Sequence, residues 1–227
     1  HSGNHKIIAG KPLPDAILKE NPDEVHEGGA NLRKQLENMQ IHGVSPVVAV
    51  NVFPGDHDGD IKAIEEIAEE YGARVATTTH FSEGGKGAAP LAEAIAEAAE
   101  EPSEFKVLYP DEMPLREKVQ TIAQKIYGAD GVEFSTQANK QIDTYEANGF
   151  GNLPICIAKT HLSISSNASL KGAPTGWTLP VREVRASVGA GFVYPICGDM
   201  RTMPGLGANP AAASIDIDES GEIVGLS

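Results

Sequence analysis

Basic residues are scarce in this sequence of 227 residues. There are 18 Lys and Arg against 32 Asp and Glu, so the formal net charge is −14. Nonspecific binding to nucleic acids or to anionic membranes requires a basic surface that displaces counterions. The charge therefore argues against both kinds of binding, and a bound anion would need local Lys or Arg side chains.

Cysteines and long apolar runs are scarce too. Only Cys156 and Cys197 are present, each within an apolar, strand-like run, which predicts two buried, reduced thiols in a cytoplasmic protein. No window of about 18 apolar residues predicts a membrane span. The chain begins at His1 with neither an initiator Met nor the apolar core of a signal peptide, and we therefore expect a fragment of a longer protein.

The first part of the sequence has the pattern of an α/β protein. From Gly43 to about Lys159, short apolar runs alternate with amphipathic stretches, which is typical of βα units around a parallel sheet. Residues 45–52 predict a strand covered on both faces, because they are almost all apolar and β-branched. Further strands are expected at 73–77 and 107–109. Apolar residues at helical spacing predict helices at 32–39, 61–72, 90–100, 115–128 and 135–148.

The pattern changes past Leu153, where apolar strands are separated by clusters of Gly, Pro, Ser and Asn. We therefore predict a boundary near Gly151, between a parallel-sheet α/β domain and a smaller β-rich α+β domain. Residues 215–224 alternate and turn like a β-hairpin, with the loop at 219–221.

The acidic segment 56–60 superficially resembles a calcium loop, since Asp occupies its first, third and fifth positions. The sixth position is Ile61 instead of Gly, and the twelfth is Ile67 instead of Glu. We instead expect Asp58 or Asp60 to cap the following helix.

Other motifs of catalysis or metal binding are incomplete. The glycine-rich run 84–87 opens a helix and could contact an anion, but it lacks the spacing of a phosphate-binding Walker A loop, and a plain tight turn is an equal alternative. The seven His residues show no zinc-ligand spacing, and no G-x-S-x-G motif is present. We predict no catalytic residue and no metal ligand.

Two of the few aromatic residues occupy the positions where open α/β sheets bind ligands. Phe53 follows the first predicted strand and Phe81 follows the second. One is backed by Pro54 and the other is followed by Gly84 and Gly85, which would suit a planar ring held between apolar faces. The alternative is that each ring packs into the core.

The whole sequence resembles the C-terminal part of the formate–tetrahydrofolate ligases. The segments that carry this resemblance are 8–13, 30–32, 47–54, 81–87, 149–160, 172–176, 190–192, 198–206 and 215–226. The resemblance implies residues 1–29 as the tail of a truncated N-terminal domain, 30–151 as an α/β domain with part of the folate slot, and 152–227 as a β-rich C-terminal domain.

For the complete enzyme, the resemblance implies ATP-dependent formylation of tetrahydrofolate at N10 from formate, through formyl phosphate. MgATP and tetrahydrofolate are the implied substrates, and stimulation by a monovalent cation, a homotetrameric state and a cytoplasmic location are implied too. The family's ATP-binding loop would lie upstream of His1. We therefore expect these 227 residues to be inactive without the missing N-terminal domain.

The implied folate slot comprises Phe53, Pro54 and Phe81, with Gly84 and Gly85 beside it. Many relatives carry Trp at the position of Phe81, so the stacking face is kept here and the indole N–H is lost.

Two other functions stay open. The chain could be a folate-binding or assembly module that keeps the fold without the reaction, or a nucleotide-binding domain that uses residues 84–87. Four basic residues are candidates for anion contacts, with surface or interdomain salt bridges as the alternative: Lys159, Arg182, Arg185 and Arg201.

Overall fold

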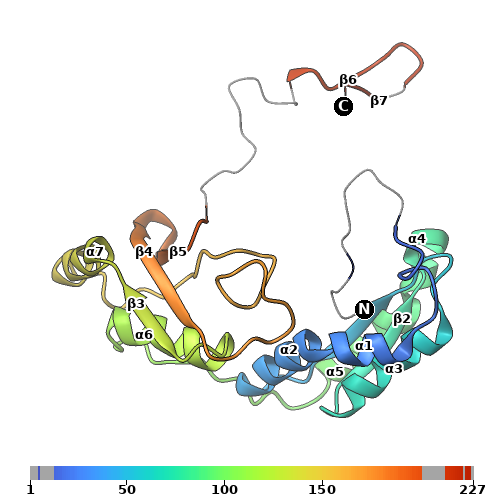
Figure 1. Cartoon of the computed structure of the whole chain (residues 1–227), viewed down its shortest axis with the longest axis horizontal. Helices are drawn as coiled ribbons and strands as arrows, with labels where there is room; N and C mark the ends of the chain where they lie inside the picture. Colours follow the sequence, from blue (N-terminus) through green and yellow to red (C-terminus); the bar gives the residue numbers. More distant parts are fainter. Residues whose placement is uncertain (1–4, 6–12, 201–212, 222, 226–227) are drawn as a thin grey trace.

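The computed structural model describes residues 5, 13–200, 213–221 and 223–225, and shows a mixed α/β protein (Figure 1). Its described part contains a two-stranded parallel sheet, a three-stranded mixed sheet and a small antiparallel hairpin. The residues form two groups, each around its own hydrophobic core. Among the described residues, no helix is both long and apolar enough to cross a membrane.

The first group is built on the parallel pair β1 and β2, in which Val47 aligns with Arg74. Its elements are α1 (Pro22–Gly28), α2 (Ala30–Ile41), β1 (Val47–Asn51), α3 (Asp58–Glu69), β2 (Arg74–Thr78), α4 (His80–Glu83), η1 (Gly84–Ala88) and α5 (Ala89–Ala99). Helix α3 connects the two strands, as a parallel pair requires. The core contains Leu36, Ala68 and Ala73.

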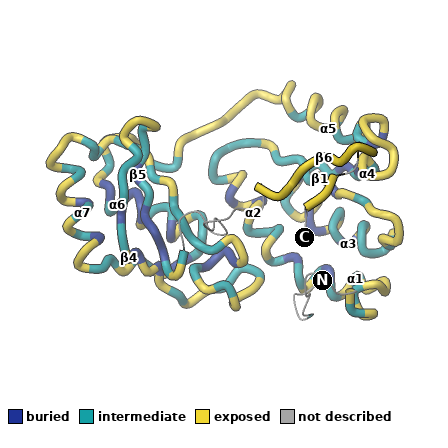
Figure 2. The backbone as a smooth tube through the Cα atoms, turned by 90° about the horizontal axis from the view of Figure 1, so that it is seen from above, coloured by how far each residue is buried: buried dark blue, intermediate teal, exposed yellow. Residues whose placement is uncertain are grey.

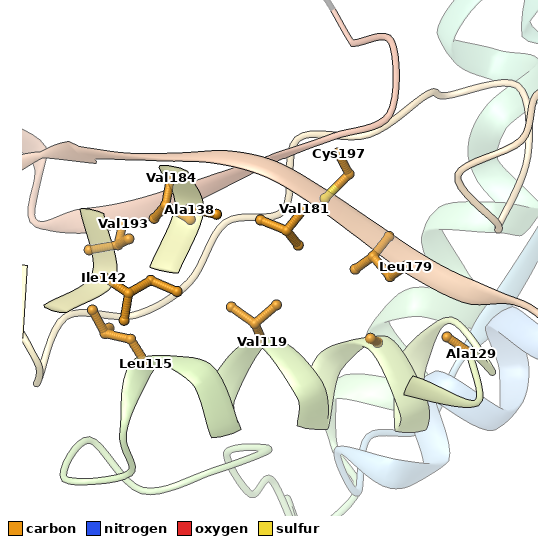
Figure 3. Packing of buried hydrophobic residues seen from close by; sticks show 11 residues of the cluster. Leu115, Val119, Ala129, Ala138, Ile142, Leu179, Val181, Val184, Val193 and Cys197 are labelled. Atoms are coloured by element: carbon orange, nitrogen blue, oxygen red, sulfur yellow. The ribbon is translucent and has the colours of Figure 1, made fainter. Parts of the chain in front are cut away.

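The second group is built on β3 (Gly131–Phe134), which pairs in parallel with β4 (Thr178–Ser187). Strand β4 also pairs antiparallel with β5 (Phe192–Cys197). The sheet is accompanied by three helical elements: α6 (Leu115–Thr121), the π-helical turn η2 (Ile122–Ile126) and α7 (Thr136–Ala147). The short η3 (Val188–Ala190) joins β4 to β5. Figure 3 shows side chains of α6, α7, β4 and β5 meeting in one core.

Most of the expected elements are confirmed. Ser135 caps α7, because its side-chain oxygen accepts a hydrogen bond from the Ala138 N–H. The hairpin of β6 (Asp216–Ile217) and β7 (Ile223–Val224) has its turn at the expected place, and Figure 2 shows both strands exposed.

Four expectations about local structure were wrong. Residues 107–109 form no strand. Strand β1 is not covered on both faces, because the described elements leave Ala49 and Asn51 exposed. His57, not an Asp, is the N-cap of α3, although Asp58 and Asp60 place negative charge in its first turn. Cys197 is buried, but Cys156 is exposed, since its segment lies at the rim of the sheet rather than inside it; both thiols are free.

The predicted boundary near Gly151 falls inside the second group. Strands β3 and β4 pair across that position, and α7 contributes Ile142 to the same core as Val184 of β4. We propose that the division of the chain lies instead in the extended segment 101–114, between the two cores.

Candidate functional site

The rings of Phe53 and Phe81 lie together at one edge of the parallel sheet. Phe53 follows β1 by two residues and Phe81 belongs to α4, directly after β2. Because parallel strands end at the same edge, the two loops meet there. The ring centroids are 4.9 Å apart with planes inclined by 53°. The rings are 43% and 65% exposed, so neither is packed into the core.

The turn that follows β1 fixes the position of Phe53. The Phe53 N–H donates to the carboxylate of Asp56 at 2.8 Å, and the Asp56 N–H donates back to the Phe53 carbonyl at 3.1 Å. Pro54 and Gly55 form the tip of this turn, where Gly55 has a φ of +99° that favours glycine. The reciprocal bonds present the Phe53 ring at the sheet edge.

The carboxylates of Asp56 and Asp60 are engaged in hydrogen bonds within the chain. Besides the bond of Asp56, the carboxylate of Asp60 accepts from the Asn21 N–H at 2.8 Å, and His57 lies 3.0 Å from the Leu18 carbonyl. In the part of the chain that the structure describes, no group of three His, Cys, Asp or Glu could hold a metal ion.

An apolar cavity of about 500 Å³ adjoins Phe53. The segment 13–18, the carboxyl end of β1 and helix α3 line it, with Leu18, Val50, Pro54 and Ile61 among the lining residues. Its volume lies within the range of small-molecule sites. The two rings and this cavity together form the candidate site.

Gly84 and Gly85 lie close to Phe81 in sequence and are exposed. They begin the 3₁₀ helix η1, which runs directly into α5. A side chain at either position would meet no atom within 4 Å. The glycines therefore leave open space on this side of the Phe81 loop.

Three of the four candidate anion-binding residues make contacts within the chain. The Lys159 ammonium donates to the Ser163 carbonyl at 2.5 Å, and Arg182 donates to the Met200 carbonyl at 2.6 Å. Arg185 pairs with Glu183 at 2.7 Å. Arg201 lies outside the described residues.

Lys118 is a buried cation that no sequence motif indicated. Its side chain is fully buried, and its ammonium donates to the carbonyls of Gly151 at 2.8 Å and Leu153 at 3.1 Å while lying over the Tyr109 ring. Burial lowers the pKa of this ammonium. Helical spacing could have predicted this burial, because Lys118 follows Leu115 by three residues and so lies on the apolar face of α6.

Comparison with known proteins identifies the family of this chain. The family model described as formate–tetrahydrofolate ligase matches residues 1–227. A protein of this name from Saccharopolyspora erythraea is 65% identical over 227 residues, and formate–tetrahydrofolate ligase 3 of Rubrobacter xylanophilus is 57% identical over 235. Another, from Cutibacterium acnes, is 54% identical over 226 residues.

These alignments cover 100% of this chain but only 40–41% of each relative. The chain thus spans about two fifths of the length of the curated relatives it matches. The family model matches the whole chain, and several relatives of the same name are more than half identical to it. Both findings give the same family. The chain belongs to the formate–tetrahydrofolate ligase family.

Proposed function

We propose that this chain forms the tetrahydrofolate-binding part of a ligase that formylates N10 of tetrahydrofolate from formate, with ATP. The observation that carries the proposal is the pair of exposed rings, Phe53 and Phe81, beside an apolar cavity at the sheet edge. The pterin of a folate is a flat ring system whose faces stack on aromatic and proline side chains. Pro54 adds a third apolar surface, and Gly84 and Gly85 leave room beside it.

The proposed reaction has two steps. Formate attacks the γ-phosphate of ATP to give formyl phosphate and ADP, and the N10 amine then attacks the formyl carbon and releases phosphate. Both steps require clamps for anions more than a protein nucleophile. In this division of labour, the present chain holds the amine that accepts the formyl group.

The sequence lacks the loop motif that would hold the phosphates of MgATP. The sequence contains no Gly-Lys-Ser or Gly-Lys-Thr, and three of its candidate basic residues are engaged within the chain. We therefore assign the phosphate chemistry to the part of the ligase that the relatives have in addition. We also propose a cytoplasmic homo-oligomer as the working form.

A titration with tetrahydrofolate tests the folate site. Phe53→Ala and Phe81→Ala should each raise the Kd about two- to tenfold, because each removes one stacking face. Phe105→Ala is the control, since Phe105 is about as exposed as Phe81 but stacks on His42 instead. No binding, or binding indifferent to both changes, would favour the assembly module. ATP binding that Lys86→Ala abolishes would favour the nucleotide-binding alternative.

An activity assay tests the division of labour separately. With ATP, formate and tetrahydrofolate, the 227 residues alone should show no turnover. Turnover comparable to that of a full-length relative would refute the assignment of phosphate chemistry to another part of the enzyme.

A further inference from the structure

The sequence contains a single Asn-Gly pair, Asn148–Gly149, at the C-terminal end of α7. In such a pair the glycine nitrogen can attack the asparagine side-chain amide, because glycine has no side chain that blocks the approach. Asparagine is accordingly among the thermolabile residues. Asn148 and Gly149 are both exposed, and Gly149 has a φ of +85°, which favours glycine. The pair therefore meets the chemical and steric requirements for deamidation.

The folded conformation keeps the two reacting groups apart. The Asn148 side-chain amide donates to the Thr144 carbonyl at 2.7 Å, and the Gly149 N–H donates to the Glu146 carbonyl at 3.1 Å. At a ψ of 9°, Asn148 turns the Gly149 nitrogen towards its own backbone nitrogen and away from its Cβ. The attack therefore requires the last turn of α7 to open, and helix ends open at a low cost in free energy.

Helix α6 holds the chain on both sides of this pair. Before the pair, the Glu146 carboxylate accepts a hydrogen bond from the Leu115 N–H at 2.9 Å. After the pair, the Lys118 ammonium binds the carbonyls of Gly151 and Leu153 at 2.8 and 3.1 Å. Because these contacts restrain the end of α7, their loss should let the last turn open more often.

We propose that Asn148 is a deamidation site whose rate is set by the opening of the last turn of α7. The Gly149 backbone nitrogen bonds to the side-chain carbonyl carbon of Asn148 as the bond from that carbon to the amide nitrogen breaks. The proton of the Gly149 N–H leaves with the amide as ammonia, and a five-membered succinimide remains. Water then opens this ring at either carbonyl and gives aspartate or isoaspartate. The reaction needs no co-reactant besides water.

The product places a carboxylate where α7 had a neutral side-chain cap. The Thr144 carbonyl loses the donor of the amide, and a negative charge beside the last carbonyls of a helix is unfavourable. Isoaspartate also lengthens the backbone by one carbon, which displaces the Gly149 N–H from the Glu146 carbonyl. Deamidation should therefore weaken the contacts of α7 with α6.

Incubation of the chain at neutral pH, followed by peptide mass spectrometry, tests the site. Asn148 should gain the mass difference between an amide and an acid, and an isoaspartyl methyltransferase should label it. Asn152 is the matched control, because it is exposed on the same segment but is followed by Leu153. It should stay unchanged over the same time. No gain at Asn148, or an equal gain at Asn152, would overturn the proposal.

Two comparisons test the control by the last turn of α7. Urea should speed the reaction about tenfold or more, because unfolding removes both restraining hydrogen bonds. Lys118→Met should speed it about two- to tenfold in the folded chain, whereas Lys62→Ala, which changes an exposed side chain, should not. Circular dichroism would verify that both variants are folded. Equal rates in the folded and the unfolded wild type, or no acceleration in folded Lys118→Met, would overturn the proposed control.

Discussion

At the scale of single residues, Lys118 shows how the second core holds a charge on backbone carbonyls and an aromatic ring. Two backbone carbonyls and the face of Tyr109 surround its ammonium, and the Tyr109 hydroxyl in turn accepts from the Ile155 N–H at 3.1 Å. These bonds attach α6 to the segment that leads from α7 into the sheet. Lys118 thus fixes a connection that has no regular secondary structure of its own.

We predict that Lys118→Ala lowers the free energy of unfolding by about 2–5 kcal/mol, because it leaves a cavity and two unpaired carbonyls. Lys118→Met should cost less, since it retains most of the volume. Urea titration of both variants provides the measurement. Lys62→Ala is the control, because the Lys62 side chain is 73% exposed; equal losses for Lys62→Ala and Lys118→Ala would contradict the assigned role.

Cys197 gives a prediction about pH. Burial raises the pKa of its thiol to about 12. The protonated Cys197 thiol contributes its full stabilisation below the pKa of the unfolded thiol, near 9. This stabilisation is lost as the pH rises towards 12, because in that range the thiol ionises only in the unfolded chain. Buried lysines change the unfolding free energy with pH in the opposite direction. Because they are present in both proteins, the difference in unfolding free energy between wild type and Cys197→Ala reports on the thiol.

That difference in unfolding free energy should shrink by about 1.4 kcal/mol per pH unit above pH 9. Urea titrations of both proteins from pH 7 to pH 10.5 would measure it. A difference independent of pH would show that folding does not raise the pKa of the Cys197 thiol.

The two thiols should also differ in reactivity. At pH 7, a thiol reagent should label Cys156, which is exposed, well before Cys197.

At the scale of elements, the turn between β2 and α5 has a tightly packed base, where the Thr79 N–H donates to the Gly87 carbonyl at 3.0 Å, and an exposed tip. Gly87 is the critical residue of the base, since an added Cβ would contact backbone atoms of Thr79. Gly85 is at the tip and has free space around it. Two glycines only two positions apart thus serve different purposes.

Gly87→Ala should destabilise the protein by about 1–3 kcal/mol, because backbone atoms on both sides of the base must shift. Gly85→Ala should change the free energy of unfolding by less than about 1 kcal/mol. Thermal unfolding of the two variants measures both effects. Gly87→Ala as stable as Gly85→Ala would mean that the base is not tightly packed.

At the scale of the whole molecule, the described chain has two cores with few connections between them. The Lys34 ammonium donates to the Lys125 carbonyl at 3.1 Å, and the Asn31 amide donates to the Gly172 carbonyl at 3.5 Å. Each is a side-chain bond at the surface, and such bonds contribute little to stability. Neither core is therefore strongly coupled to the other.

We predict that the two groups unfold in separate transitions. The single Trp177 packs against the second core and reports on it alone. Leu36→Ala should lower the stability of the first group by about 2–5 kcal/mol and shift part of the far-UV circular dichroism signal. Tryptophan fluorescence should keep its midpoint in Leu36→Ala and shift in Val119→Ala. A common shift of both signals would show one cooperative unit.

Sequence patterns predicted local structure well because the helices and strands follow from the spacing of nearby residues. The cap at Ser135, the hairpin turn and the periodic helices all depend on residues within about one or two turns of each other. Burial was predicted less well. Whether Cys156 is covered, or which face of β1 is open, depends on elements far away in the sequence.

The sequence by itself determined the family, the α/β pattern and the placement of Phe53 and Phe81 after two strands. Only the tertiary structure decided that the strands are adjacent, that the two rings touch, and that β3 and α7 share a core with β4 and β5. The physical reason is that spacing along the chain encodes local conformation, whereas contact between distant segments depends on which apolar faces pack together.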